Sequence, residues 1–126
     1  MVKAPAIEKR FTSIIELLQE IIVRANYFEN RVIREGHSDD TRKVISLLKL
    51  ISYSFRSFST RLEEFKDFFP EFKDDIEKIQ NHCNEVPNLA TKRMSLGIER
   101  LRSKLATIRQ ESNNLYDSMN VYAQEY

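Results

Sequence analysis

Residues 11–32 read FTSIIELLQEIIVRANYFENRV, and the spacing of their apolar side chains decides the fold class. Counted from Ile7, apolar positions alternate in steps of four and three, which places them on one face of an α-helix. The residues that share this face are Ile7, Phe11, Ile14, Leu18, Ile21, Ala25, Phe28 and Val32. The face is widened by Ile15, Leu17 and Ile22. A wide apolar face packs against two neighbours, so this segment is typical of a helical bundle.

The ends of this first helix are set by glycine and by short polar residues. We predict a helix over residues 4–35, ended by Gly36 in the left-handed conformation. Residues 36–39 read GHSD and form a loop. Ser38 is expected to cap the following helix through its hydroxyl oxygen.

The next apolar stripe repeats the same spacing. It comprises Val44, Leu48, Ile51, Phe55, Phe58, Leu62, Phe65 and Phe69. The phase then continues past Pro70 through Phe72, Ile76, Ile79, Cys83 and Val86. Because a proline can either begin a helix or kink one, two interpretations stay open. Either a turn separates helices 39–69 and 70–86, or 39–86 is one helix kinked at Pro70.

The last stripe predicts a helix over residues 88–125. Pro87 marks its beginning, because the residue before a proline is pushed out of the helical region. The stripe comprises Met94, Ile98, Leu101, Leu105, Ile108, Ser112, Leu115, Met119 and Tyr122. Ser112 is the one polar residue on it. With no capping signal before Tyr126, we expect the chain to be the N-terminal domain of a longer protein.

The predicted fold is an all-α, antiparallel up-down bundle of three or four helices, forming one domain over residues 1–126. The chain has only two glycines and three prolines, too few for the regular turns of a sheet protein. If Pro70 is a kink, helices 70–86 and 88–104 form a two-helix arm that exposes apolar surface unless it dimerises. The chain has no signal peptide and no apolar run of 18 residues, so an intracellular, cytoplasmic location is the default expectation.

Charge is balanced overall but patterned locally. The formal net charge of +1 indicates no general attraction to nucleic acid or to an anionic membrane. Residues 63–85 carry eight acids, whereas residues 92–109 carry six bases and one acid. Since a short turn joins these blocks, they either pair across a hairpin or present a basic face to an acidic partner or phosphate. The residues predicted to bind a partner are Phe68, Phe69, Phe72, Arg93, Arg100 and Lys104.

Motifs for catalysis, metal binding and cofactors are nearly absent. The sequence has no glycine-rich phosphate loop, no HExxH and no CxxC, so we predict neither cofactor nor metal. The lone Cys83 lies on an apolar stripe and is predicted to be a small buried side chain. The spacing of Arg31 and His37 is similar to the Arg-x(4–6)-His pattern of the HEPN helical ribonucleases. That resemblance implies RNA cleavage by this pair, although here it spans a helix end and a loop, whereas the family carries it within a later helix.

Three functional hypotheses follow from these patterns. The first is a non-enzymatic interaction or assembly module, such as a scaffold, that binds a protein partner or a second copy through coiled-coil-like helix packing. The second is an N-terminal signalling or membrane-targeting bundle whose first helix is released to a lipid surface. The mixed charges of that helix argue against it, because interfacial helices carry a basic polar face. The third is a HEPN-like ribonuclease; otherwise no nucleic-acid partner is expected.

Overall fold

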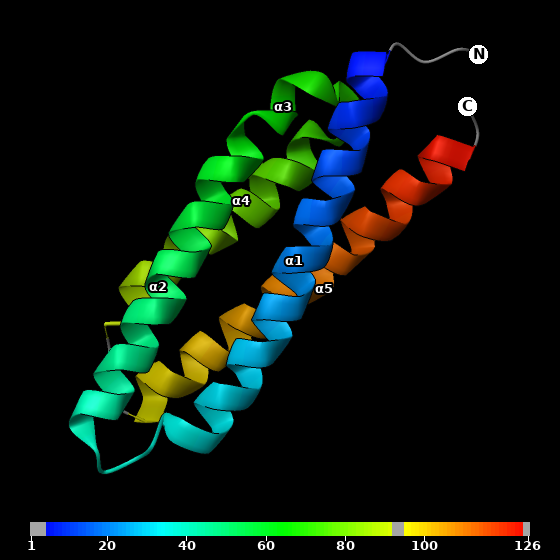
Figure 1. The fold of residues 1–126 in the computed structure, drawn as a ribbon. Helices are drawn as coiled ribbons and strands as arrows, with labels where there is room; N and C mark the ends of the chain where they lie inside the picture. The colour runs from blue at the N-terminus through cyan, green and yellow to red at the C-terminus, as the bar shows by residue number, and fades with distance from the viewer. Residues whose placement is uncertain (1–4, 92–94, 125–126) are drawn as a thin grey trace.

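The computed structural model describes the backbone of residues 5–91 and 95–124, and over these ranges the protein is all-α without a strand. Four long helices form the bundle: α1 (Pro5–Glu35), α2 (Thr41–Glu63), α4 (Lys73–Leu89) and α5 (Ser95–Gln124). A short helix, α3 (Phe65–Phe68), and one 3₁₀ turn, η1 (Pro70–Phe72), link α2 to α4. The predicted all-α bundle is therefore confirmed, in its four-helix form (Figure 1).

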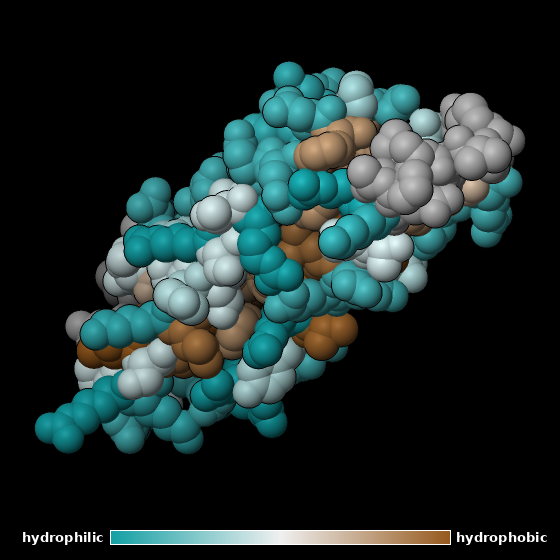
Figure 2. All heavy atoms as spheres, turned by 45° about the horizontal axis from the view of Figure 1, so that its top comes forward, coloured by the Kyte–Doolittle hydropathy of each residue, from teal (hydrophilic) through white to brown (hydrophobic). Residues whose placement is uncertain are grey.

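The helices run up and down in chain order around one core. The main packing partners are α1 with α5, α2 with α4 and α4 with α5, while α1 and α2 approach each other less closely. Figure 1 shows α1 beside α2, with α4 and α5 behind them. Figure 2, turned by 45° from the view of Figure 1, shows apolar side chains at the surface in narrow patches between hydrophilic ones.

The predicted apolar stripes form this core. All of the described residues at their four-and-three spacing are buried apart from Phe11 and Tyr122, which pack against its edge, and Ile15 and Ile22 beside the first stripe are half-buried. Aromatic rings join the helices: Phe28 of α1 and Phe55 of α2 have ring centroids 6.3 Å apart, and Phe58 meets Phe55 edge-on at 5.3 Å. α1 and α2, which pack less closely than the other neighbouring long helices, are thus bridged by large side chains.

Pro70 lies in a turn, so of the two interpretations left open the single kinked helix over 39–86 is wrong. The exposed two-helix arm, which depended on that kink, is wrong as well. The predicted boundary at residue 69 is also wrong, because α2 ends at Glu63. Phe69, with φ −131° and ψ 73°, leaves the helical region, as the steric clash with a following proline favours, and Pro70 begins the 3₁₀ turn. Phe69 nevertheless stays in the core, where its ring centroid lies 6.4 Å from that of Phe11.

Pro87 does not end a helix, which corrects the predicted boundary between 86 and 88. Helix α4 continues through Pro87 to Leu89, and the N–H of Ala90 donates to the Val86 carbonyl at 2.8 Å. A proline near the end of a helix removes only its own hydrogen bond, so the last turn survives. The described part of α5 begins at Ser95, and Met94 lies outside the described residues.

Gly36 ends α1, but not in the predicted left-handed conformation. No described residue has a positive φ. A Cβ at this position would lie 2.6 Å from the Val32 carbonyl oxygen and 2.9 Å from Ile98 Cγ2 of α5. The glycine is therefore explained by two close approaches, that of the Val32 carbonyl in the last turn of α1 and that of Ile98 in α5.

The predicted cap of the second helix is also corrected. Asp40, rather than Ser38, is the N-cap residue, and its carboxylate accepts from the Lys43 N–H at 3.3 Å. The Ser38 hydroxyl oxygen instead accepts from the Asp40 N–H at 3.1 Å, which orders the loop before the helix.

Replacing Gly36 with alanine is expected to lower the free energy of unfolding by about 1–3 kcal/mol, the usual effect of overpacking a tight contact. Urea denaturation would measure it. Asp39→Ala, in the same loop and exposed, is the control and should change stability by less than about 0.5 kcal/mol. Equal stability of Gly36→Ala and the unaltered protein would contradict the close-approach explanation.

Candidate functional site

Helix α2 carries a row of cations that takes no part in holding the bundle together. Arg42, Lys49 and Arg56 recur every seven residues and so lie on one side of the helix. None of the three has an ion-pair partner within residues 5–91 and 95–124. The other two cations of α2 do, and both pair with α1: Lys43 with Glu35 at 3.5 Å and Arg61 with Glu20 at 2.8 Å.

Two members of the unpaired row, Lys49 and Arg56, border a groove of about 450 Å³ between α2 and the C-terminal end of α4, here called the α2/α4 groove. It is lined by Ile45, Leu48, Lys49, Ser52, Tyr53, Arg56, Pro87, Ala90 and Thr91. Small side chains at Ser52 and Ala90 leave space between the two helices. Pro87 adds an apolar ring there. The groove therefore has an apolar floor and a cationic edge.

A second hollow, of about 460 Å³, continues this surface along α2. It is lined by Tyr53, Arg56, Ser57, Thr60 and Arg61, so the two hollows share Tyr53 and Arg56. Together they extend from Ile45 to Arg61, roughly 24 Å at 1.5 Å per residue. Every charged side chain lining either hollow is a cation.

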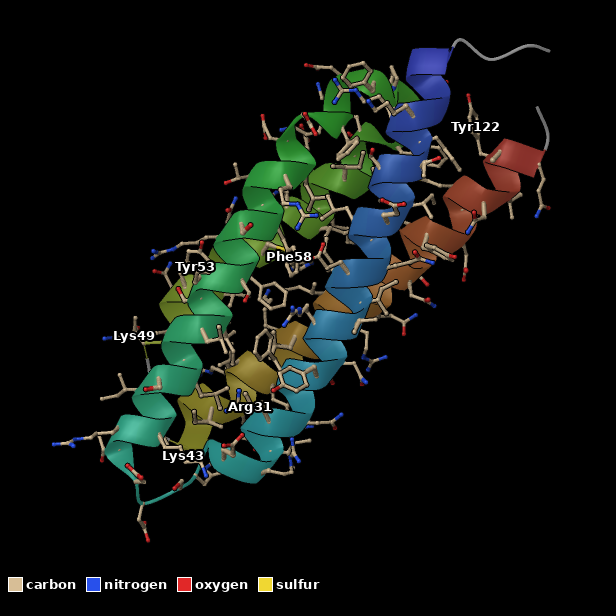
Figure 3. All side chains as sticks on the ribbon, viewed as in Figure 1. Arg31, Lys43, Lys49, Tyr53, Phe58 and Tyr122 are labelled. Atoms are coloured by element: carbon tan, nitrogen blue, oxygen red, sulfur yellow. The ribbon has the colours of Figure 1, made fainter. Side chains whose placement is uncertain are left out.

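Tyr53 stands at the junction of the two hollows. Its side chain is 76% exposed, more than any other large apolar or aromatic residue in the described part of the chain. Lys49 and Tyr53 point away from the bundle, whereas Phe58 of the same helix points into it (Figure 3). A tyrosine in this position offers an amphipathic ring to a ligand, and it takes no part in the core.

The predicted aromatic site residues are placed differently from one another. Phe69 and Phe72 lie in the core, so their rings are not available at the surface of this fold. Phe68 is 45% exposed, and the Arg10 guanidinium of α1 lies 4.4 Å above its ring. The structure thus separates Phe68 from its two aromatic neighbours. Its role in partner binding stays a prediction.

The predicted basic residues of α5 face α4 at a third hollow of about 480 Å³. Arg100 and Lys104 line it together with Glu85, whereas Arg93 lies outside the described residues. Lys104 forms an ion pair with Glu85, which joins the acidic and basic blocks across the hairpin. This pairing holds the pKa of the Glu85 carboxyl below its usual range. Because one of its two cations is neutralised, this hollow is less positive than the α2/α4 groove.

His82 adjoins this ion pair, with Nδ1 3.0 Å from Lys104 Nζ. Burial, then the nearby charge of Lys104, lowers the pKa of His82, with Lys78 acting in the same sense and Glu85 and Glu111 opposing it. The folded protein therefore keeps the ring neutral below the ordinary pKa of about 6.5, at which the unfolded chain takes up a proton.

We accordingly expect part of the stability to be lost as the pH falls from about 7 through the lowered pKa of His82. His82→Gln should remove this part and flatten the dependence in that window. Urea midpoints at pH 7.5, 6.5 and 5.5 would measure it for both proteins. If the two sets of midpoints run parallel, His82 does not contribute to the dependence.

The pair that resembles the HEPN pattern is held by two carboxylates on different helices. Arg31 Nε lies 2.7 Å from Glu35 Oε2, and His37 Nε2 lies 3.7 Å from Glu99 Oε1 of α5. The Arg31 hydrogen bond lowers the pKa of the Glu35 carboxyl. A phosphodiester at Arg31 would have to displace that carboxylate, and cleavage by this pair remains a hypothesis.

Other reactive groups are few. Cys83 is fully buried, as predicted, and burial raises the pKa of its thiol to about 12. Within the described ranges, histidine, cysteine and acidic side chains form no cluster of three or more that could hold a metal ion. None of the described helices combines the length and apolar character needed to cross a bilayer.

Comparison of the chain with protein-family models, curated proteins and solved structures found no match. The site is therefore argued from its own residues. One sequence signal points to it: residues 41–62 contain five cations and no acid, in a chain of net charge +1. The other half of the groove, Pro87 to Thr91, lies more than thirty residues away in sequence and required the fold.

Proposed function

We propose that this protein is a non-enzymatic interaction module that docks a protein partner in the α2/α4 groove. One observation carries the proposal: an apolar-floored groove is edged by cations that have no ion-pair partner in the described part of the chain. Exposed cations contribute little to the stability of a bundle, so their alignment beside the groove is not accounted for by folding. Contact with an outside partner would account for both features together.

The packing of the bundle supports a surface site rather than exchange of a core helix. All four long helices bury their apolar stripes against one another. Release of any one helix would expose that stripe, whereas the groove offers apolar surface with the bundle intact. Docking therefore requires no large change in the fold.

A photoreactive phenylalanine at Tyr53 tests the location of the site in the full chain. Irradiation in the native cell should give a discrete crosslinked protein, and the same residue at Val23 of α1, which is 66% exposed, should not. The crosslinked protein would then be purified and its affinity measured against Lys49→Glu/Arg56→Glu. We expect a loss of at least tenfold.

The matched control is Lys9→Glu/Arg24→Glu, which makes the same charge change at exposed positions of α1. It should bind as the unaltered protein does. Equal crosslinking at positions 53 and 23, or equal affinities of the two double variants for the purified partner, would contradict the proposal.

A further inference from the structure

We infer that the partner segment is an amphipathic α-helix carrying carboxylates at seven-residue spacing beside an apolar stripe. This inference rests on the proposed docking function of the α2/α4 groove and names the chemistry of its occupant. It comes from three properties of the groove: the spacing of its cations, its apolar floor and its length.

The spacing of the cations matches that of a second helix. Lys49 and Arg56 of the groove are roughly 10.5 Å apart along α2, at 1.5 Å per residue, and Arg42 continues the row at the same interval beyond the groove. A helix lying along α2 presents side chains at the same interval when its acidic residues recur every seven positions. Two carboxylates can then meet Lys49 and Arg56 at the groove in register, and a third can meet Arg42 beyond its end, in either chain direction.

The floor of the groove requires apolar contacts from the same partner. The floor is formed by Ile45 and Leu48 of α2 together with Pro87 and Ala90 at the C-terminal end of α4. A nucleic acid would contact the cations through phosphates but leave this floor uncovered, and a flat lipid surface would not follow a groove between two helices. An acidic amphipathic helix satisfies both parts at once.

The outer surface of α2 extends the contact beyond the groove. Ser57 carries a hydroxyl in the second hollow, whereas Thr60 and Thr91 donate theirs to the backbone carbonyls of Arg56 and Asn88. The hydroxyl of Ser57 can donate a hydrogen bond to a carboxylate of the partner. With Tyr53 between the two hollows, the surface suits an elongated occupant of about four turns rather than a compact small molecule.

Three synthetic helical peptides of about 21 residues test this directly. All carry leucines on one stripe; the edge positions at seven-residue intervals hold glutamate, glutamine or lysine. Fluorescence anisotropy on the full chain should give at least tenfold tighter binding for the glutamate peptide than for the glutamine peptide. Raising the salt from 50 to 300 mM should weaken it several-fold, because exposed charge pairs are screened. In NMR spectra, the backbone amide chemical shifts that change on adding the glutamate peptide should be concentrated at Lys49, Tyr53 and Thr91.

Exchanging the charges provides the matched control. The variant Lys49→Glu/Arg56→Glu is first checked for unchanged helicity and melting temperature. It should then bind the glutamate peptide more weakly, and the lysine peptide more tightly, than the unaltered protein does. Lys9→Glu/Arg24→Glu should behave as the unaltered protein. Restoring affinity by reversing both partners distinguishes direct pairing from a structural effect.

Each other outcome overturns a stated part. If the glutamine peptide binds as tightly as the glutamate one, or the exchange fails, the acidic partner is wrong while the docking groove stands. If no peptide binds but Tyr53 crosslinks a protein in the cell, the partner class alone fails. If phosphatidylserine vesicles or duplex RNA bind through Lys49 and Arg56 and no peptide does, both the partner class and the protein-docking function are wrong.

Discussion

Replacing Phe55 with alanine lowers the free energy of unfolding by about 3–5 kcal/mol, the usual loss for a large buried aromatic side chain. Phe55 is fully buried on α2, and its ring contacts Phe28 of α1 and Phe58 one turn away. Because α1 and α2 approach each other less closely than the other neighbouring helices, little backbone packing offsets the lost ring. A domain of this size is stable by about 5–15 kcal/mol, so the change removes a large share.

The measurement is urea denaturation followed by circular dichroism at 222 nm. Tyr53→Ala is the matched control, since it removes an aromatic ring from the same helix at an exposed position and should change stability by less than about 0.5 kcal/mol. Similar losses for the two variants would mean that the assignment of inward and outward faces of α2 is incorrect.

The core of this bundle could be predicted from the sequence, because helical spacing alone determines which side chains share a face. Ile14 and Phe28, like Leu101 and Leu105, are buried as their stripes require. Even the phase across Pro70 carried correct information. Phe69 and Phe72 keep facing the core although the chain turns there.

The turns could not be predicted in the same way, because the spacing of apolar residues does not determine the backbone conformation between the helices. Gly36 is explained by the Val32 carbonyl of α1 together with Ile98 of α5, which is distant in sequence. Pro87 is tolerated within α4, where only one hydrogen bond is lost. The apolar stripe keeps the same phase on both sides of Pro70, which is compatible with a kink as well as with a turn. Only the backbone conformation of Phe69 distinguishes the two.

The candidate site, too, could be predicted only in part. Pairing between the acidic and basic blocks is confirmed at Glu85 and Lys104. The aromatic residues near Pro70 are predicted from the sequence to bind a partner, yet Phe69 and Phe72 are buried in the core. The α2/α4 groove could not be predicted from the pattern of any single helix, because its cations lie on α2 whereas part of its floor comes from α4.

The single cysteine offers a second large effect. With the pKa of Cys83 raised to about 12 by burial, its thiolate fraction at pH 8 is roughly a thousandfold lower than that of an exposed thiol. Alkylation by iodoacetamide should therefore be at least a thousandfold slower in the folded protein than in 6 M guanidinium chloride. Mass spectrometry of quenched samples gives both rates.

Labelling of the folded protein must then proceed through opening of the bundle, since Cys83 lies on the core face of α4. If opening is a rapid pre-equilibrium, the labelling rate follows the population of the open form. Phe55→Ala should consequently accelerate labelling by roughly 150- to 5,000-fold, the ratio that corresponds to about 3–5 kcal/mol, while Tyr53→Ala leaves it unchanged. A labelling rate insensitive to Phe55→Ala would show that α4 opens locally, independently of its packing with the rest of the bundle.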